Sequence, residues 1–372
     1  MVVWIKELEG VLSVDTISVW MKENIDVQPY KGLESVKAGD IVMISAKDAA
    51  KASDFEPYKV LLYEETCETL SQNVLEECHY HYDYYYIKNA LIRAKNPRID
   101  TVVSGSSYGL FDIDEGRLEH GINLSLMSQD LYYSLQGIYE VCKYNQNIKN
   151  IVLCCGYYYF HTDLSKAQNP NEILRLAKVY GPIFHDLHNC VTLPPKKNIL
   201  FQSNIFALQR VAEVYSAEEY ERHYFRIDKP RKKQATKVWE DLSKDWFQLT
   251  EEEKIQAGVK RGTQHNKNLK RELSVMENVV LFQQFVTFCN KHNLHLLMVV
   301  APASKYYRNV LSTDYHDTFY DVLNKVDGTI HLLDLYEDPA YTDKDFNDTD
   351  HLNELGAAKM TEAVLQILET LR

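Results

Sequence analysis

The sequence lacks any uninterrupted apolar stretch of the roughly 18 residues that a membrane-spanning helix requires. Its first residues, MVVWIKELEG, already carry charge at the sixth and seventh positions. Its seven cysteines are odd in number and show none of the paired spacings of metal sites, which favours a reducing compartment. We therefore expect a cytoplasmic protein without a membrane span.

Positive charge is also scarce. The chain has 41 Lys and Arg against 53 Asp and Glu, a net charge of −12, whereas nucleic acids and anionic membranes select basic patches. We therefore expect neither as a partner. The one clear basic run, Lys229–Lys233, fits a solvated loop beside an acidic helix. A length of 372 residues with 45% hydrophobic and 25% charged residues indicates a globular protein of two domains, or of one domain with an insertion.

A glycine-rich phosphate loop is missing as well. Short strand-like runs occupy the first 95 residues, at Val2–Ile5, Ile17–Trp20, Ile41–Ser45 and Lys59–Tyr63. They predict a small Rossmann-like α/β domain over residues 1–96. A dinucleotide site needs Gly-x-Gly-x-x-Gly directly after the first strand, but this chain has Lys-Glu-Leu-Glu-Gly there. We predict that this domain binds no nucleotide or other cofactor and docks a protein partner or another subunit.

Two groups of histidines were considered as metal ligands. His79, His81 and Asp83 would share one face of a strand, but at the start of a helix they would diverge, and no fourth ligand lies nearby. His185 and His188 have the i, i+3 spacing of one helix face, where polar residues are ordinary. We predict no metal site at either place.

The remainder of the chain is organised around IDTVVSGSSYGLFDI, residues 99–113. Its β-branched run breaks at Ser-Gly-Ser-Ser, as a buried strand does where it enters a tight turn. In open α/β sheets this carboxyl edge is where ligand crevices form. Far downstream, Asp348 and His351 lie three residues apart before a final amphipathic helix, so a short turn can aim the imidazole while the carboxylate orients it. The pattern predicts a catalytic triad of Ser107, His351 and Asp348.

Strands and helices alternate around these motifs, which predicts a parallel sheet with right-handed crossovers over residues 97–372. The predicted strands are 99–103, 121–124, 151–155, 295–300 and 329–333, and the predicted helices include 128–147 and 355–371. The long, charged and helix-prone stretch at about 195–275 breaks this alternation. We interpret it as a helical insertion that covers the edge of the sheet.

Four blocks in this order resemble those of the SGNH (GDSL-like) hydrolase and acyltransferase superfamily. They are Gly105-Ser106-Ser107, Asn123–Ser128, Gly156-Tyr157-Tyr158 and Asp348–His351. Only the last matches without change: Ser106 replaces an Asp, Ser128 replaces a Gly, and Tyr158 stands where the family has Asn. The resemblance extends to divergent members that acylate surface polysaccharides or teichoic acids. It implies a flavodoxin-like parallel sheet.

The resemblance also implies a function, namely a serine-dependent O-acyltransferase or esterase that acts on a bacterial cell-surface glycan or its precursor through an acyl-enzyme. The expected oxyanion hole consists of the backbone N–H groups of Ser107 and Ser128, with the Tyr158 hydroxyl as a third donor. The alternative is an SGNH-like binding or accessory protein of polysaccharide biosynthesis that keeps the triad without turnover.

Aromatic residues gather at the predicted carboxyl ends of the strands. Tyr157, Tyr159, Tyr306 and Tyr307 are candidate substrate-binding residues there, because sugars stack on aromatic rings. His265, near the end of the insertion, is a further candidate. Packing of the insertion against the sheet is an equally open interpretation of these side chains.

Overall fold

The computed structural model describes residues 1–6, 21–62, 83–84, 86–167, 169–190 and 246–371. These residues fall into two units, one within residues 1–82 and one from residue 83 onward. The expected boundary between residues 96 and 97 therefore lies inside the second unit. Several predictions fall outside the described residues, namely those for Ile17–Trp20, His79, His81, Lys229–Lys233 and the loop after the first strand.

The first unit contains a four-stranded parallel sheet in the order β2-β1-β3-β4. Its strands are β1 (Val2–Ile5), β2 (Asp26–Pro29), β3 (Ile41–Ile44) and β4 (Lys59–Leu62). Val42 and Ile44 of β3 pack against Phe55 in its core. The carboxylate of Asp40 holds the start of β1, because it accepts hydrogen bonds from the Val2 amide at 2.8 Å and the Trp4 indole at 3.0 Å.

The second unit contains a five-stranded parallel sheet in the order β6-β5-β7-β8-β9. Its strands are β5 (Thr101–Gly105), β6 (Gly121–Asn123), β7 (Asn150–Cys155), β8 (His295–Val300) and β9 (His331–Asp334). Numbered within the unit, this order is 2-1-3-4-5, a doubly wound arrangement in which ligands bind where the first and third strands diverge. The predicted parallel α/β sheet is therefore confirmed, and its switch point lies between the carboxyl ends of β5 and β7.

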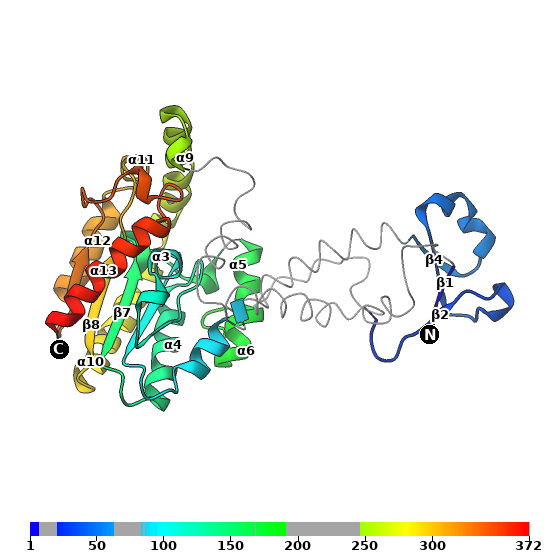
Figure 1. The fold of residues 1–372 in the computed structure, drawn as a ribbon, viewed down its shortest axis with the longest axis horizontal. Coiled ribbons are helices and arrows are strands. Elements are labelled where there is room, and N and C mark those ends of the chain that lie inside the picture. The colour runs from blue at the N-terminus through cyan, green and yellow to red at the C-terminus, as the bar shows by residue number, and fades with distance from the viewer. Residues whose placement is uncertain (7–20, 63–82, 85, 168, 191–245, 372) are drawn as a thin grey trace. The chain divides into compact units, whose positions relative to one another are not determined.

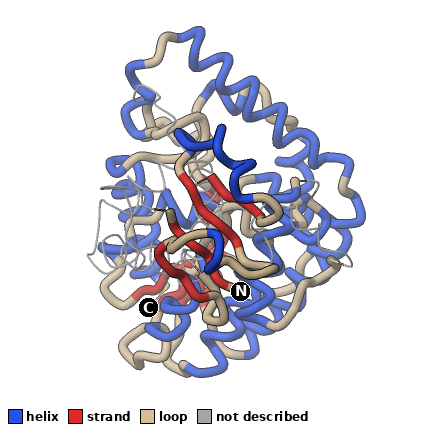
Figure 2. Tube along the Cα trace, turned by 90° about the vertical axis from the view of Figure 1, so that its right-hand side faces the viewer, coloured by secondary structure: helices blue, strands red, loops and turns tan. Residues whose placement is uncertain are grey.

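Helices flank this sheet (Figures 1 and 2). They are α3 (Ser107–Asp112), α4 (Leu131–Tyr144), α5 (Pro170–Arg175), α6 (Gly181–Phe184), α9 (Glu251–Asn266), α10 (Glu272–Lys291), α11 (Lys305–Arg308), α12 (Asp314–Lys325) and α13 (Glu354–Thr370). α3 packs with α13, and α4 packs with α10. Within the described ranges, no helix is both long and apolar enough to cross a membrane.

The helical run of α5 and α6 ends at Phe184, before the two histidines that we expected on one helix face. His185 has a left-handed φ of 54° and His188 a φ of 52°, conformations that a helix does not contain. The predicted helical pairing of these side chains is therefore wrong. They lie in a turn, and the two side chains differ in burial, His185 being exposed and His188 partly buried.

Candidate active site

The candidate nucleophile, Ser107, is the first residue of α3 and follows β5 after a single residue. Gly105 has a φ of 137°, and a Cβ at this position would lie 2.0 Å from the carbonyl oxygen of Cys154 on β7. Glycine is therefore the residue that permits this turn. Across the switch point, a Cβ on Gly156 would lie 2.9 Å from the ring of Tyr108. At both Gly105 and Gly156, a side chain would therefore clash with a neighbouring segment.

The loop before α13 aims the candidate base at this serine. Oδ1 of Asp348 accepts the backbone N–H groups of Asp350 and His351, each at 2.9 Å, which closes the loop into an Asx turn. The turn brings the imidazole back to the same carboxylate, with Nδ1 2.9 Å from Asp348 Oδ2. On its other side, His351 Nε2 lies 2.9 Å from Ser107 Oγ. Asp350 Oδ1 is 4.0 Å from Nδ1, so the orienting carboxylate is Asp348, as the spacing predicted.

Two buried hydrogen bonds attach this loop to α3. The amide of Leu352 donates to Asp112 Oδ1 at 2.7 Å, and the hydroxyl of Tyr108 donates to Asp350 Oδ2 at 3.0 Å. Asp112 and Asp350 are 0% and 1% exposed, so neither bond competes with water. The loop that carries His351 is thus bonded to both ends of α3, the helix that begins with Ser107.

Arg261 on α9 is the site residue that the sequence analysis missed. Its Nε lies 3.0 and 3.1 Å from the two carboxylate oxygens of Asp350. Gly258 and Gly262 let α9 come this close, because a Cβ on them would lie 2.3 Å from the Tyr306 carbonyl oxygen and 2.7 Å from Val310 Cβ. The available signal was the i, i+4 spacing of Arg261 and His265, which places both on one helix face.

The charges at the site act on the two ionisable groups in opposite directions. Burial would raise the pKa of Asp350, but the adjacent Arg261 guanidinium holds it well below its usual range. Burial lowers the pKa of His351, but the carboxylates of Asp348 and Asp350 outweigh it and raise the pKa from 6.5 to about 9. Asp348 is 47% exposed, whereas His351 and Ser107 are 7% and 5% exposed. The two carboxylates therefore favour the charged form of the imidazole.

Asp348, Asp350 and His351 are also close enough to ligate one cation, with their ligating atoms within 4.8 Å of one another. Asp350 is already neutralised by Arg261, and His351 Nε2 is occupied by Ser107. We therefore interpret the group as a triad with a flanking ion pair.

The predicted oxyanion donors are the backbone N–H groups of Ser107 and Ser128 and the hydroxyl of Tyr158. Ser128 has a φ of 54° and lies in a turn. This turn is closed by a hydrogen bond of 3.3 Å from the Gln129 amide to the Leu126 carbonyl. This conformation is the one that a type II turn requires at its third residue, a position that favours glycine. In the part of the chain that the structure describes, the backbone N–H groups of Ser107 and Ser128 have no hydrogen-bond partner.

Tyr158 and His265 lie together inside the protein. The hydroxyl of Tyr158 donates to that of Tyr108 at 3.3 Å, so its proton is directed toward the Asp350 network. Its ring contacts that of His265 at a centroid distance of 4.2 Å, and His265 Nδ1 hydrogen-bonds the Tyr307 hydroxyl. Burial, and then the charge of Arg261, lower the pKa of His265 well below its ordinary value. These side chains therefore pack against one another in the interior, next to the hydrogen bonds of Asp350.

The other candidate substrate-binding tyrosines diverge. The hydroxyl of Tyr157 donates to Asp334 at 2.6 Å, that of Tyr159 to Ser134 at 2.6 Å, and that of Tyr306 to Glu251 at 2.5 Å. These three tyrosines, together with Tyr158 and Tyr307, are at most 8% exposed. Successive residues of the short 3-10 helix η4 (Tyr157–His161) point in different directions, so these rings pack the interior and offer no exposed stacking surface.

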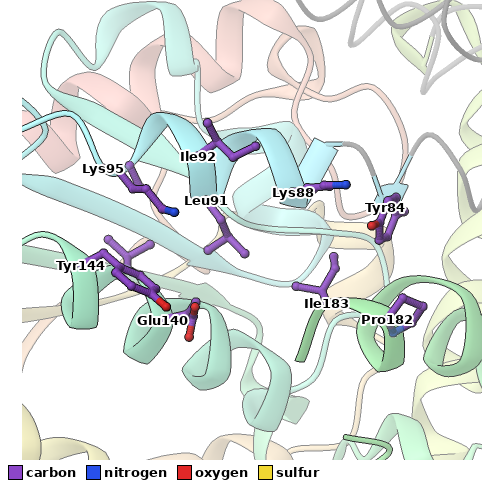
Figure 3. Close-up of a pocket in the computed structure, with 11 residues that line it drawn as sticks. Tyr84, Lys88, Leu91, Ile92, Lys95, Glu140, Tyr144, Pro182 and Ile183 are labelled. Carbon is purple, nitrogen blue, oxygen red and sulfur yellow. The ribbon is translucent and has the colours of Figure 1, made fainter. Parts of the chain in front are cut away.

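A pocket of ≈ 220 Å³ lies elsewhere in the second unit (Figure 3). It is formed by the helix over residues 86–93, α4 and α6, and Leu91, Tyr144 and Pro182 are among its lining residues. It shares no residue with the triad. It therefore adds no group to the candidate active site.

No protein-family model matches the chain, and no curated protein sequence matches it significantly. The site is consequently defined by its own geometry. It is a Ser-His-Asp arrangement at the switch point of a doubly wound parallel sheet, flanked by the ion pair of the buried Asp350 with the partly buried Arg261.

The raised pKa of His351 predicts the pH dependence of any reaction at Ser107. A general base must be neutral, so kcat/KM should rise about tenfold per pH unit below pH 9 and level off above it. The measurement is the rate of cleavage of an activated ester from pH 6 to 10, with the rate of Ser107→Ala subtracted. Asp348→Asn should move the midpoint to lower pH. A midpoint near 6.5 in the unaltered protein would contradict this assignment.

The pair of Arg261 and Asp350 predicts a stability effect and a shift of the pH profile. Arg261→Met leaves a buried carboxylate unpaired and should lower the free energy of unfolding by about 3 kcal/mol. Because Arg261 lowers the pKa of His351, its removal should move the pH midpoint upward. Denaturant unfolding and the pH profile measure the two effects. Lys260→Met, at the exposed neighbouring position, should change stability by less than about 0.5 kcal/mol.

Proposed function

We propose that the protein is a serine-dependent esterase or O-acyltransferase of the SGNH type, which acts on a bacterial cell-surface glycan or its precursor. One observation carries the proposal: His351 bridges Ser107 Oγ and Asp348, at 2.9 Å on each side, at the switch point of the sheet. The order of the four recognised blocks supports the family, and the family supports the glycan substrate.

In the proposed reaction, Ser107 Oγ attacks the ester carbonyl while His351 Nε2 takes the hydroxyl proton. Asp348 keeps Nδ1 protonated and stabilises the imidazolium that forms. His351 then gives the proton to the leaving alkoxide, which leaves an acyl-enzyme on Ser107. In the second half, His351 removes a proton from water or from a sugar hydroxyl, and that oxygen attacks the acyl carbon. The bond between the acyl carbon and Ser107 Oγ then breaks, and His351 returns the proton to Oγ.

The oxyanion that forms in each half requires donors. The N–H groups of Ser107 and Ser128 are proposed for this role, because no described group uses them. The Asn of the related family is absent, and Tyr158 donates to Tyr108. Since one missing donor typically costs about 100- to 1000-fold in rate, we expect a slow enzyme.

One observation favours a second function. Ser107 is only 5% exposed, and the raised pKa of His351 disfavours the neutral imidazole that a general base requires. An SGNH-like binding or accessory protein of polysaccharide biosynthesis would retain such a triad without turnover. The protein partner expected for the first unit fits either function.

Turnover of 4-nitrophenyl acetate at pH 9 tests the proposal. Ser107→Ala should lower kcat/KM by at least about 1000-fold, because a triad without its nucleophile loses most of its rate. Ser106→Ala is the matched control: this adjacent hydroxyl is also buried but makes no hydrogen bond to a described residue, so its loss should change the rate by less than about threefold. Equal rates in the unaltered protein and Ser107→Ala would favour the accessory function.

The same assay separates a transferase from an esterase. A transferase should consume the activated ester faster when an oligosaccharide acceptor is added, and acylated sugar should appear in the product mixture. An unchanged rate across a panel of acceptors, without acylated sugar, would identify an esterase.

A further inference from the structure

A second group of ligating side chains lies apart from the triad. Ligating atoms of Asp130, Asp163 and His188 lie within 4.8 Å of one another. Asp130 caps the N-terminus of α4, Asp163 caps the short helix η5 (Leu164–Lys166), and His188 lies in the turn after α6. Asp130 and Asp163 are 1% and 3% exposed. Three separate segments of the chain thus place one ligand each at the same buried point.

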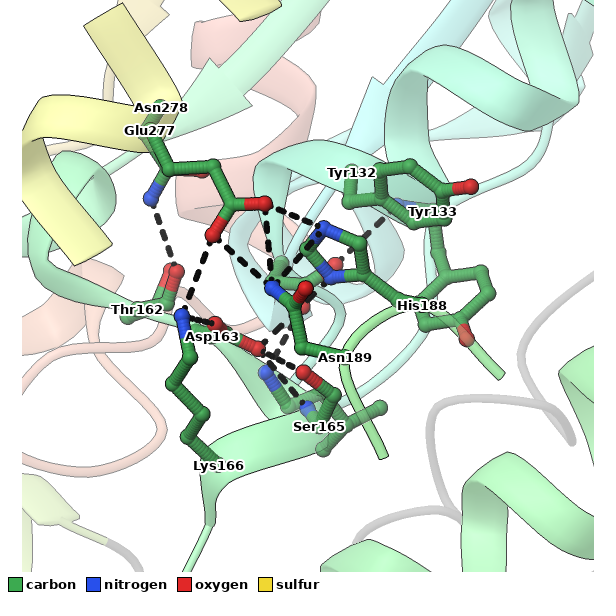
Figure 4. Close-up of polar contacts among 12 residues, drawn as sticks. Tyr132, Tyr133, Thr162, Asp163, Ser165, Lys166, His188, Asn189, Glu277 and Asn278 are labelled. Atoms are coloured by element: carbon green, nitrogen blue, oxygen red, sulfur yellow. Dashed lines mark hydrogen bonds and ion pairs between the residues drawn. The ribbon is translucent and has the colours of Figure 1, made fainter. Parts of the chain in front are cut away.

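His188 has the surroundings of a metal-ligating histidine (Figure 4). Its Nε2 is 3.0 Å from Glu277 Oε1, and its ring stacks on Tyr132 at a centroid distance of 3.8 Å. These contacts fix the ring and direct the other nitrogen, Nδ1, to a point 3.7 Å from Asp163 Oδ1. The side chain is 9% exposed, and Nδ1 is buried without a hydrogen-bond partner among the described residues. Histidines that bind metal through one nitrogen usually donate the other N–H to a carboxylate, as Glu277 provides here.

The charges of the cluster are unbalanced. Asp130, Asp163 and Glu277 contribute three negative charges around the imidazole. Among the described residues, Lys166 pairs with two of them, since its Nζ is 2.7 Å from Asp163 Oδ2 and 3.0 Å from Glu277 Oε2. In this part of the chain one lysine thus faces three carboxylates, and buried charges in proteins are paired or bind metals. A divalent cation beside Nδ1 would supply the missing charge.

We propose that Asp130, Asp163 and His188 bind one divalent transition-metal ion, of the type of Zn²⁺ or Mn²⁺. A mixed set of one imidazole and two carboxylates suits these ions, whereas Ca²⁺ and Mg²⁺ prefer oxygen ligands alone. The Lys166 side chain is 40% exposed and can turn to solvent when the ion binds Asp163. The ion links the turn that contains His188 to Asp130, the N-cap residue of α4. Asp130 lies two residues after Ser128. The site is separate from the triad and shares no ligand with it.

Titration of the full-length protein tests this site. After removal of metal with a chelator, ZnCl₂, MnCl₂ and CaCl₂ are titrated separately in a calorimeter. We expect one equivalent of Zn²⁺ or Mn²⁺ to bind and Ca²⁺ not to bind. His188→Ala should abolish this binding, and Glu277→Gln should weaken it about 10- to 100-fold. His185→Ala, an exposed histidine of the same segment, is the matched control and should bind as the unaltered protein does.

Thermal unfolding separates loss of the metal from loss of the fold, because His188→Ala also removes the stacking on Tyr132. Chelator should lower the Tm of the unaltered protein loaded with metal and leave the Tm of His188→Ala unchanged. Two results would overturn the proposal. One is no binding at one equivalent and no effect of metal on Tm, in which case the cluster is an ion-pair network around a protonated His188. The other is binding that survives His188→Ala and disappears in His351→Ala.

Discussion

The geometry of the candidate active site depends on the buried carboxylate of Asp112. It accepts the amide of Leu352, the residue after His351, and it belongs to α3, the helix that begins with Ser107. Since 244 residues separate Ser107 from His351, local geometry cannot bring them together. The hydrogen bond from Leu352 to Asp112 and the one from Tyr108 to Asp350 hold the two segments together. They thereby fix the distance between Ser107 Oγ and His351 Nε2. Without a bonded partner, a buried carboxylate would be costly, so the interaction also holds the loop in its folded position.

The topology of the sheet determines where this meeting occurs. β5 lies between β6 and β7 in the sheet. After β5 the chain forms β6 on one side of it and then β7 on the other. Gly105 and Gly156 allow the two strand ends to come together without a Cβ in the way. The insertion contributes through α9, whose two glycines bring Arg261 against Asp350. A charge that would otherwise be unpaired next to the base is thereby neutralised.

Much of this architecture was accessible from the sequence. β1 and β8 were predicted with their observed bounds because β1 is apolar throughout and β8 is apolar after its first residue. That Ser107, His351 and Asp348 lie together was expected from a serine at a strand end and an Asp-x-x-His before a helix. β2 was missed, because Asp26–Pro29 has a polar residue at alternate positions and ends in proline, which edge strands tolerate.

The directions of side chains were less accessible. The tyrosines were placed at the correct strand ends, but a 3-10 turn points consecutive rings to different partners, which periodicity does not predict. Arg261 was missed because a charged residue in a helix rich in charges is expected to face solvent. Its partner, Asp350, is instead buried. His188 was assigned to a helix face because nothing in the sequence predicts its left-handed φ. The proposed metal site, contrary to the expectation of none, depends on that turn.

Covalent labelling with a fluorophosphonate probe tests the central claim, that Ser107 is activated by His351, most directly. We predict a single adduct, located on Ser107 by peptide mass spectrometry, which forms faster at pH 9 than at pH 7 and is absent from His351→Asn. Absence of any adduct at pH 9, or an adduct on Ser106 that persists in His351→Asn, would contradict it.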